Sequence, residues 1–265
     1  MISALAQFVG GSALRFLNYV GEVVLLAVES IGSILRGRIR WRLATHHVFE
    51  VGYRSQLVVI VTGAFTGAVF TAQTYFQFRA LGMASAVGPV VAVAMCRELG
   101  PVLAGLMVAG RVGAAMSAEI GTMKVTQQID ALRALAVHPV DYLVVPRTLA
   151  MFISMPLLVA ECIFCGIGAG YLVATRFLDV GAAYYVANMY RFTSHTDILM
   201  GVSKGLVFGL LIVFISCHQG LRAKDGAVGV GRATTESVVI CSLAILIVNF
   251  FLTMALNIVF PAGGL

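Results

Sequence analysis

The sequence predicts an all-α integral membrane protein, and three observations support this fold class. Of the 265 residues, 60% are hydrophobic and only 11% are charged, and the mean hydropathy is +0.96. Soluble chains are about 45–50% apolar and about 25% charged. Several apolar runs also reach the roughly 20 residues that a helix needs to cross a bilayer. Together these features exclude a cytosolic enzyme, a disordered chain and a nucleic-acid-binding domain.

Residues 3–35 predict an amphipathic helix. Their only charged residues are Arg15, Glu22 and Glu29, which are seven positions apart. Seven residues advance an α-helix by about 700°, so the three charges form one stripe. A helix with one polar stripe and a broad apolar face lies in the membrane interface more readily than it spans the bilayer. We therefore expect an interfacial helix, with a sixth span as the alternative.

Five further segments predict transmembrane helices within a single domain over residues 1–265. They cover residues 57–78, 87–110, 144–175, 201–220 and 237–260. The third is longer than a span requires, so we expect it to tilt or to extend beyond the bilayer.

The positive charges predict the orientation, because cytoplasmic connections of membrane proteins are enriched in Lys and Arg. Twelve of the 18 basic residues lie in connections on one side of the predicted spans and four on the other. The twelve are Arg36, Arg38, Arg40, Arg42, Arg54, Arg111, Lys124, Arg133, Arg147, Arg222, Lys224 and Arg232. The four are Arg79, Arg176, Arg191 and Lys204. This count places the N-terminus in the cytoplasm and the C-terminus outside.

Two connections predict helices of their own. Residues 119–136 form a cytoplasmic stretch in which Met123, Ile129 and Leu132 share one side of a helix. Residues 176–200 are outside and rich in aromatic side chains, which suits an outer interfacial helix.

Small residues recur at helical spacing in three spans, where they let helix backbones approach closely. The pattern supports a compact bundle or a dimer without choosing between them. The residues are Gly63 and Gly67, Gly166 and Gly170, and Gly201, Gly205 and Gly209.

Arg97 and Glu98 are adjacent charges near the centre of a predicted span, where each costs a few kcal/mol on insertion scales. Helix neighbours point about 100° apart, so we expect separate partners or a wet cavity. Gly100 and Pro101 could break the helix directly afterwards, as at the substrate sites of transporters. The alternative is a structural ion pair with a neighbouring helix.

Four other polar residues lie within predicted spans. Glu161 is either a protonated acid inside the bundle or a substrate contact, and Lys204 either reaches the interface or contacts an anionic head group. Gln73 and Tyr75 could line a cavity.

The sequence contains no recognisable catalytic or nucleotide-binding motif. It lacks the glycine-rich nucleotide motif ending in Lys and Ser or Thr, and it has no metal-ligand spacing or Ser/His/Asp set. Cys162 and Cys165 lie in an apolar run, and we expect them to be inert core residues. The missing catalytic set argues against an enzyme.

One stretch resembles the MlaE (YrbE) permease family, the membrane subunits of MCE-type ABC lipid transporters. The match is close over residues 97–132 and looser over most of the chain. Its motifs are Arg97-Glu98-Leu99-Gly100-Pro101, Ala109-Gly110-Arg111-Val112-Gly113 and Ala118-Glu119-Ile120-Gly121-Thr122, continuing to Leu132.

The resemblance implies a homodimer in the bacterial inner membrane. It implies a separate cytoplasmic ATPase that binds ATP and Mg²⁺, so that this chain itself carries no cofactor. A STAS-type accessory protein and a periplasmic ring of MCE-domain proteins complete the expected complex. The cargo would be phospholipid, moved between the inner and outer membranes to maintain outer-membrane lipid asymmetry.

The resemblance also assigns roles to residues. It places a lipid cavity at the dimer interface, and onto it we carry Arg97, Glu98, Gln73, Tyr75 and Lys204. It places the coupling helix on residues 119–132, which ATPase-driven motion would push. The expected contacts with the ATPase are Glu119, Met123, Lys124, Gln128, Ile129 and Leu132.

Two positions depart from the family pattern. Gln127 stands where the family often has Glu, and Asn249 stands where some members have Asp. If that acid pairs with the residue equivalent to Lys204 in other family members, the pairing is lost in this chain.

Two other classes of function compete with a lipid permease. One is an ion-coupled secondary transporter using Arg97, Glu98 and Glu161, and the other is a membrane-embedded enzyme that acts on lipid.

Overall fold

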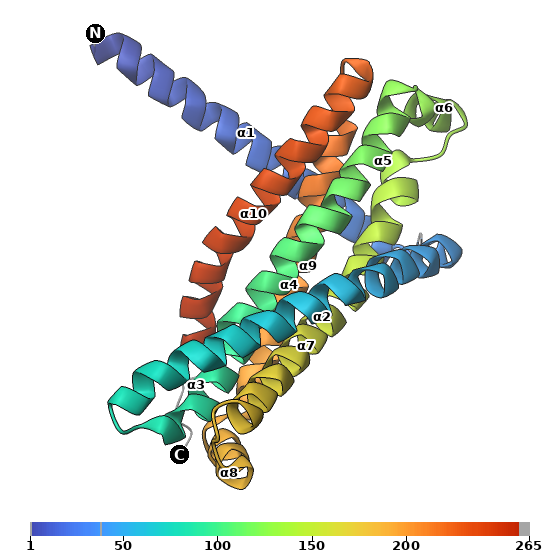
Figure 1. The fold of residues 1–265 in the computed structure, drawn as a ribbon. Helices are drawn as coiled ribbons and strands as arrows, with labels where there is room; N and C mark the ends of the chain where they lie inside the picture. Colours follow the sequence, from blue (N-terminus) through green and yellow to red (C-terminus); the bar gives the residue numbers. More distant parts are fainter. Residues whose placement is uncertain (1, 38, 260–265) are drawn as a thin grey trace.

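The computed structural model describes residues 2–37 and 39–259, and its elements there are all helical. Within these described residues, six helical segments are long and apolar enough to cross a membrane, which confirms the predicted all-α membrane class. Most of the long helices run side by side in one bundle, and α1 crosses them at a steep angle (Figure 1). The helices longer than one turn are α1 (Ile2–Leu35), α2 (Trp41–Ala80), α3 (Val87–Ala94), α4 (Gly100–Val108), α5 (Ala114–Val125), α6 (Gln128–Ala134), α7 (Val145–Arg176), α8 (Ala182–Phe192), α9 (His195–Leu221) and α10 (Gly226–Val259).

Helix α1 places acidic residues of its predicted stripe against the bundle. Glu22 lies 2.8 Å from a ring nitrogen of His218 and accepts a hydrogen bond from Arg222 at 3.1 Å. Glu29 lies 3.1 Å from a ring nitrogen of His138. From Leu14 to Leu35, α1 also carries exposed apolar side chains, among them Leu17 and Leu25. The segment Leu17–Leu35 also meets the length and composition of a span, so α1 suits either of the two expected arrangements.

Helix α2 is longer than the predicted span of residues 57–78. It begins at Trp41, so the expected connection between α1 and the first span is helical from residue 41 onward. Arg42, His46 and His47 interrupt the apolar pattern without breaking the helix. Apolar run length marks the membrane-crossing part of a helix and not its ends.

The predicted break at Gly100 and Pro101 does not occur. Residues 84–125 form one continuous helical run, which includes α3, α4 and α5. Within this run the hydrogen bonding changes from α-helical to π-helical in two turns, Met95–Leu99 and Ala109–Gly113. The first of these turns ends two residues before Pro101, whose ring nitrogen cannot donate a backbone hydrogen bond.

The cytoplasmic helix expected over residues 119–136 is instead two helices. Helix α5 continues from the membrane-crossing run to Val125, and α6 begins at Gln128. Between them Gln127 has a φ of 61°, a left-handed conformation that ends the first helix. Gln is not a typical residue for this conformation, so the sequence carries no signal for the turn.

Helix α7 coincides closely with the predicted segment 144–175. Helices α9 and α10 contain most of the predicted segments 201–220 and 237–260 but begin earlier, at His195 and Gly226. Within the predicted outer connection, residues 176–200, the short helix α8 carries the aromatic side chains. Helix α8 lies at the opposite end of the bundle from α6 (Figure 1).

The glycine motifs pack against one another within this chain. A side-chain carbon at Gly67 would overlap the backbone of Gly166, and one at Gly63 would overlap Cys162. The small residues of α2 and α7 therefore build the bundle and do not require a second copy. Gly205 and Gly209 of α9 likewise lie against α7, at Val159 and Met155.

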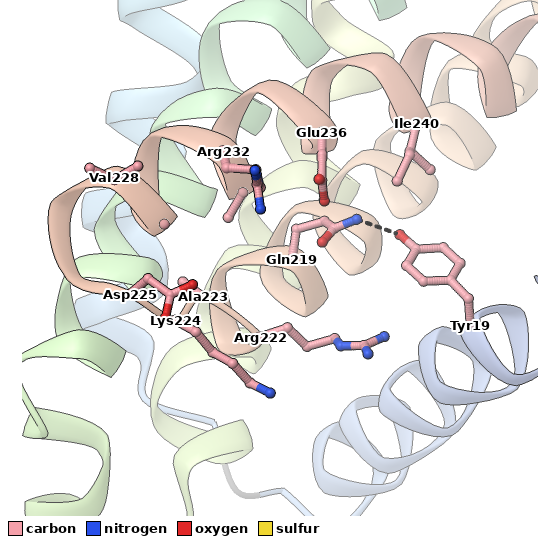
Figure 2. A pocket seen from close by; sticks show the side chains of 12 residues that line it. Tyr19, Gln219, Arg222, Ala223, Lys224, Asp225, Val228, Arg232, Glu236 and Ile240 are labelled. Atoms are coloured by element: carbon pink, nitrogen blue, oxygen red, sulfur yellow. Dashed lines mark hydrogen bonds between the residues drawn. The ribbon is translucent and has the colours of Figure 1, made fainter. Parts of the chain in front are cut away.

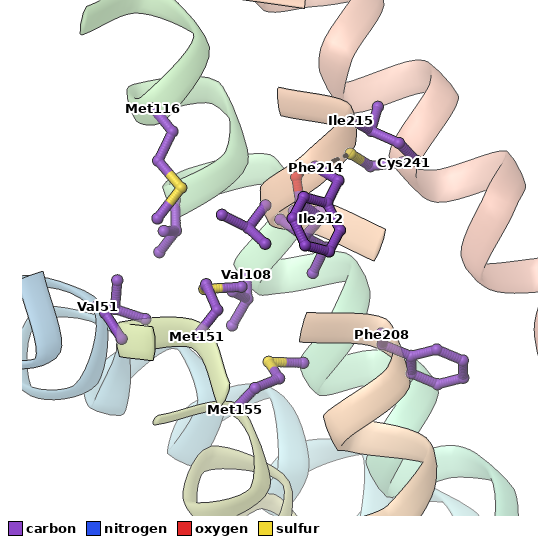
Figure 3. Packing of buried hydrophobic residues seen from close by; sticks show 14 of the residues in the cluster. Val51, Val108, Met116, Met151, Met155, Phe208, Ile212, Phe214, Ile215 and Cys241 are labelled. Carbon is purple, nitrogen blue, oxygen red and sulfur yellow. Dashed lines mark hydrogen bonds between the residues drawn. The ribbon is translucent and has the colours of Figure 1, made fainter. Parts of the chain in front are cut away.

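The apolar core fills the centre of the bundle between α2, α4, α5, α7, α9 and α10 (Figure 3). Met151, Met155, Phe208 and Ile212 are fully buried there. This core holds fixed the helices that carry the polar side chains described next.

Candidate functional site

Lys204 and Glu98 form an ion pair between α9 and the π-helical turn before α4. The Lys204 Nζ lies 2.8 Å from Glu98 Oε1, and the Lys204 side chain is completely buried. It also donates to the hydroxyl of Thr253 at 2.8 Å. Glu98 accepts further hydrogen bonds from the Asn249 amide at 2.9 Å and from Thr253 at 3.0 Å. Three helical segments that are distant in sequence therefore share one charge-balanced network.

Arg97 points to a separate partner, as expected from the angle between neighbouring helix positions. Its Nε donates to Asp197 Oδ1 at 2.6 Å, and a terminal nitrogen donates to Asn257 at 3.2 Å. The other carboxylate oxygen of Asp197 accepts from the backbone N–H of Ser194 at 2.8 Å, in a capping box at the start of α9. Asp197 therefore fixes both the start of α9 and the direction of the Arg97 side chain.

The backbone irregularity explains a third contact of Lys204. Pro101 has no N–H to offer the carbonyl oxygen of Arg97, four residues earlier. Lys204 donates to this oxygen at 2.7 Å. The buried ammonium group thus has three acceptors, which uses its three donors. We define Arg97, Glu98, Asp197, Lys204, Asn249, Thr253 and Asn257 as the polar cluster.

The polar cluster is open on one side. The Glu98 side chain is 38% exposed and that of Arg97 is 19% exposed. Nearby α10 buries little of its most apolar segment against the rest of the chain, and Phe250 and Met254 are exposed. A carboxylate and a guanidinium beside an apolar surface match an amphiphile with a charged head and apolar chains. Lys204, by contrast, is too buried and too fully bonded to meet a head group in this conformation.

The other predicted cavity residues lie elsewhere on the bundle. Gln73 is exposed on α2, and Tyr75 packs against a smaller cluster that contains Val87 and Val91. Glu161 is partly exposed on α7 and forms no ion pair with the polar cluster within the part of the chain that the structure describes. The structure therefore brings together Arg97, Glu98 and Lys204, and not the full predicted set.

Sequence reasoning missed Asp197, Asn257 and Thr253. Asp197 was placed in the outer connection, because the predicted span began at residue 201. A capping signal was present at Ser194-His195-Thr196-Asp197, where a Ser is followed three residues later by an acid. This signal predicts a helix that begins after Ser194, with Asp197 in its first turn.

At the other end of the bundle, the expected coupling residues divide into two groups. Ile129 is 1% exposed and belongs to the main core, so its expected contact with an ATPase is wrong: it anchors α6 to the bundle. Met123 packs partly against the same core.

The remaining expected coupling residues are charged or exposed. A carboxylate oxygen of Glu119 lies 2.7 Å from a terminal nitrogen of the buried Arg147, and the Lys124 Nζ lies 3.6 Å from an Asp130 carboxylate oxygen. Gln128 is exposed, and Leu132 is partly exposed.

A surface pocket lies where α1 meets the end of α9 and the start of α10. It measures about 580 Å³ and combines three basic with two acidic side chains. Figure 2 shows the Gln219 amide directed at the hydroxyl of Tyr19 across it, at 3.4 Å. Its charged residues are Arg222, Lys224, Arg232, Asp225 and Glu236.

Comparison with known proteins settles the family. The model of the family described as Permease MlaE matches residues 44–255, a range that includes every residue of the polar cluster except Asn257. The chain belongs to the MlaE permease family. The match covers all of α3 to α9 and most of α2 and α10.

Relatives of this MlaE-family chain carry transporter names. A protein of Rickettsia conorii named "Probable ABC transporter permease protein" is 42% identical over 96% of this chain and 98% of its own length. A protein of the same description from Synechocystis is 40% identical over 83% of this chain and 84% of its own. The chloroplastic protein TRIGALACTOSYLDIACYLGLYCEROL 1 of Arabidopsis thaliana is 36% identical over 88% of this chain and 66% of its own. The MlaE-family chain is thus a multi-pass membrane permease subunit of the ABC transporter type.

Proposed function

We propose that this chain is the membrane subunit of an ATP-driven phospholipid transporter. The observation that carries the proposal is the open side of the polar cluster, where Glu98 and Arg97 meet the exposed apolar face of α10. A chloroplastic relative named after a glycerolipid supports lipid as the class of cargo. In this proposal the chain carries no catalytic residue and binds neither metal nor nucleotide.

A homodimer would turn the open side into a cavity. Helix α10 is the least enclosed of the long bundle helices, whereas more than half of the most apolar segment of α9 is buried. Two copies meeting along α10 would enclose their Glu98 and Arg97 side chains between apolar walls, where acyl chains fit and the phosphate meets Arg97.

ATP would act through a separate cytoplasmic subunit. The names of the relatives support this, because an ABC permease works with an ATPase. We propose that the ATPase docks on the exposed side of α5 and α6, which includes Gln128, Leu132 and Leu135. The ion pair between Glu119 and Arg147 ties α5 to α7, so it would pass a push on α6 into the bundle.

The wider assembly follows from the family resemblance. We propose a bacterial inner-membrane location with a cytoplasmic N-terminus and a periplasmic C-terminus. The partners would be a STAS-type accessory protein and a periplasmic ring of MCE-domain proteins. The complex would move phospholipid between the inner and outer membranes to maintain outer-membrane lipid asymmetry.

The ion-coupled alternative has less support. It requires Arg97, Glu98 and Glu161 to act as one relay, but Glu161 lies on the exposed face of α7 and Arg97 and Glu98 have separate partners. Membership in an ABC permease family also argues against it.

Purification with native neighbours tests the proposal. The tagged chain should copurify with an ATPase and with phospholipid that survives exchange into fresh detergent. Mass spectrometry identifies both. A chain that copurifies with no ATPase, or retains no lipid above the level of an unrelated membrane protein, would contradict the proposal.

A further inference from the structure

Glu161 is an unusual residue on the surface of the bundle. It lies midway along α7, between Val145 and Arg176, and its side chain is partly exposed. Among the residues that the structure describes, no hydrogen bond or ion pair satisfies its carboxylate. An acid at mid-span without a partner costs a few kcal/mol on insertion scales.

The face around Glu161 is apolar and suited to a helix. Exposed side chains recur every three or four residues on this side of α7, and they form one stripe with Glu161 at its centre. Leu157 is 66% exposed and Phe164 is 79% exposed. Gly168 continues the stripe, and a side-chain carbon there would touch nothing within 4 Å, so another backbone can approach closely.

A groove continues this face toward α8. It measures about 570 Å³ and lies between α7, α8 and the start of α9. Its walls are almost entirely apolar and include Phe164, Tyr171, Met189 and Ile198.

We propose that this face and groove bind one membrane-spanning helix of a different protein, which carries a basic side chain near the middle of its span. The charge of Glu161 decides the chemistry of the partner, because a Lys or Arg at the same depth would remove the unpaired charge from lipid. An acyl chain could fill the groove but would leave the carboxylate unpaired. A second copy of this chain fits poorly, because a twofold contact along this face would bring two Glu161 carboxylates together.

Photo-cross-linking in the intact transporter complex tests the inference. A photoreactive benzoylphenylalanine at position 164 should give one protein adduct, whose cross-linked peptide comes from a membrane-spanning segment with Lys or Arg near its centre. Glu161→Leu should lower the yield of this adduct at least about tenfold, the effect of losing about 1.4 kcal/mol of binding free energy. The same probe at Phe65, exposed on α2, is the control and should be insensitive to Glu161→Leu.

Three results would overturn the inference: an adduct with lipid alone, an adduct with a second copy of this chain, or a yield unchanged by Glu161→Leu. An unchanged melting temperature of the Glu161→Leu protein in detergent shows that the variant is folded. The inference does not depend on the cargo, so it can fail while phospholipid transport holds.

Discussion

The ammonium nitrogen of Lys204 lies 2.7 Å from the main-chain carbonyl oxygen of Arg97, which Pro101 leaves without its usual helical donor. A side chain of α9 thereby completes the hydrogen bonding of a π-helical turn in another helix. Because Lys204 also binds Glu98, the turn and the ion pair hold each other in place. Arg97 and Glu98 can then project in different directions, one toward Asp197 and the other toward Lys204.

Lys204→Met should destabilise the protein strongly. The change leaves Glu98 without its charged partner and the Arg97 carbonyl without its donor. We expect a loss of about 3 kcal/mol in the free energy of unfolding, at the lower end for a broken buried pair, because Glu98 remains partly exposed. Denaturant unfolding in detergent measures it. Lys204→Met combined with Glu98→Gln should recover part of the loss, and a double variant as unstable as the single one would contradict the pairing.

Asn249→Asp should destabilise the polar cluster although some relatives are expected to have an acid there. The Asn249 amide donates to Glu98 at 2.9 Å, and an aspartate would place a second acceptor against that oxygen. The structure thus answers the doubt about this position, since Lys204 pairs with Glu98 and not with residue 249. We expect a loss of about 1–3 kcal/mol, measured by the same unfolding experiment. If Glu98→Gln fails to rescue the Asn249→Asp variant, the assigned contact is wrong.

Glu98→Lys should abolish lipid retention. It places two ammonium groups within the 2.8 Å contact that now joins Glu98 and Lys204, so the open side of the polar cluster would rearrange. Phospholipid copurifying with the variant should fall, and cells should become sensitive to detergent. Glu98→Gln, which keeps an acceptor for Lys204, is the milder control. Wild-type lipid retention and detergent resistance in the Glu98→Lys strain would leave Glu98 with only a structural role.

Leu135→Glu should separate ATPase docking from folding. Leu135 is 74% exposed after the end of α6, so a charge there should not disturb the bundle. We expect the ATPase to be lost from the purified complex while the melting temperature of this chain stays unchanged. Ile129→Glu should instead lower the melting temperature, because Ile129 is buried.

The matched control is Leu81→Glu, at an exposed position where α2 ends and far from α6. This variant should retain the ATPase. Equal ATPase binding by the Leu135→Glu and Leu81→Glu proteins would remove α6 from the docking surface.

Gly166→Ala and Gly168→Ala form a matched pair on α7. A methyl group at Gly166 would overlap the Met95 side chain and crowd the Gly63 carbonyl, whereas one at Gly168 meets open space. Gly166→Ala should lower the free energy of unfolding by about 1–3 kcal/mol, and Gly168→Ala should leave it nearly unchanged. Similar unfolding midpoints for the two variants would contradict the close packing of α2 on α7.

The sequence predicts the spans well because bilayer thickness imposes a minimum apolar length. It predicts helix ends less well, since helices α2 and α5 continue beyond their apolar runs through polar residues that helices tolerate. The turn at Gln127 left no signal because its φ of 61° is unusual for Gln.

The polar cluster could be predicted only in part. The position of Arg97 and Glu98 inside an apolar run identifies them as constrained, because isolated charges in lipid are costly. Their partners could not be identified, since Lys204 and Asp197 are about 100 residues away in sequence and periodicity within one helix does not show which neighbour a face meets. The small-residue motifs show the same limit. The sequence identifies the small-residue face of each helix, but only the structure shows that Gly67 packs against Gly166.

The most direct test of the central claim is phospholipid movement by the purified complex in proteoliposomes. Donor vesicles contain the complex and a fluorescent phospholipid, and transfer is followed with ATP, with a non-hydrolysable analogue, and with an ion gradient alone. The account predicts transfer that requires ATP hydrolysis and is lost in the Glu98→Lys variant. Transfer that persists without ATP, or that follows the ion gradient, would contradict it.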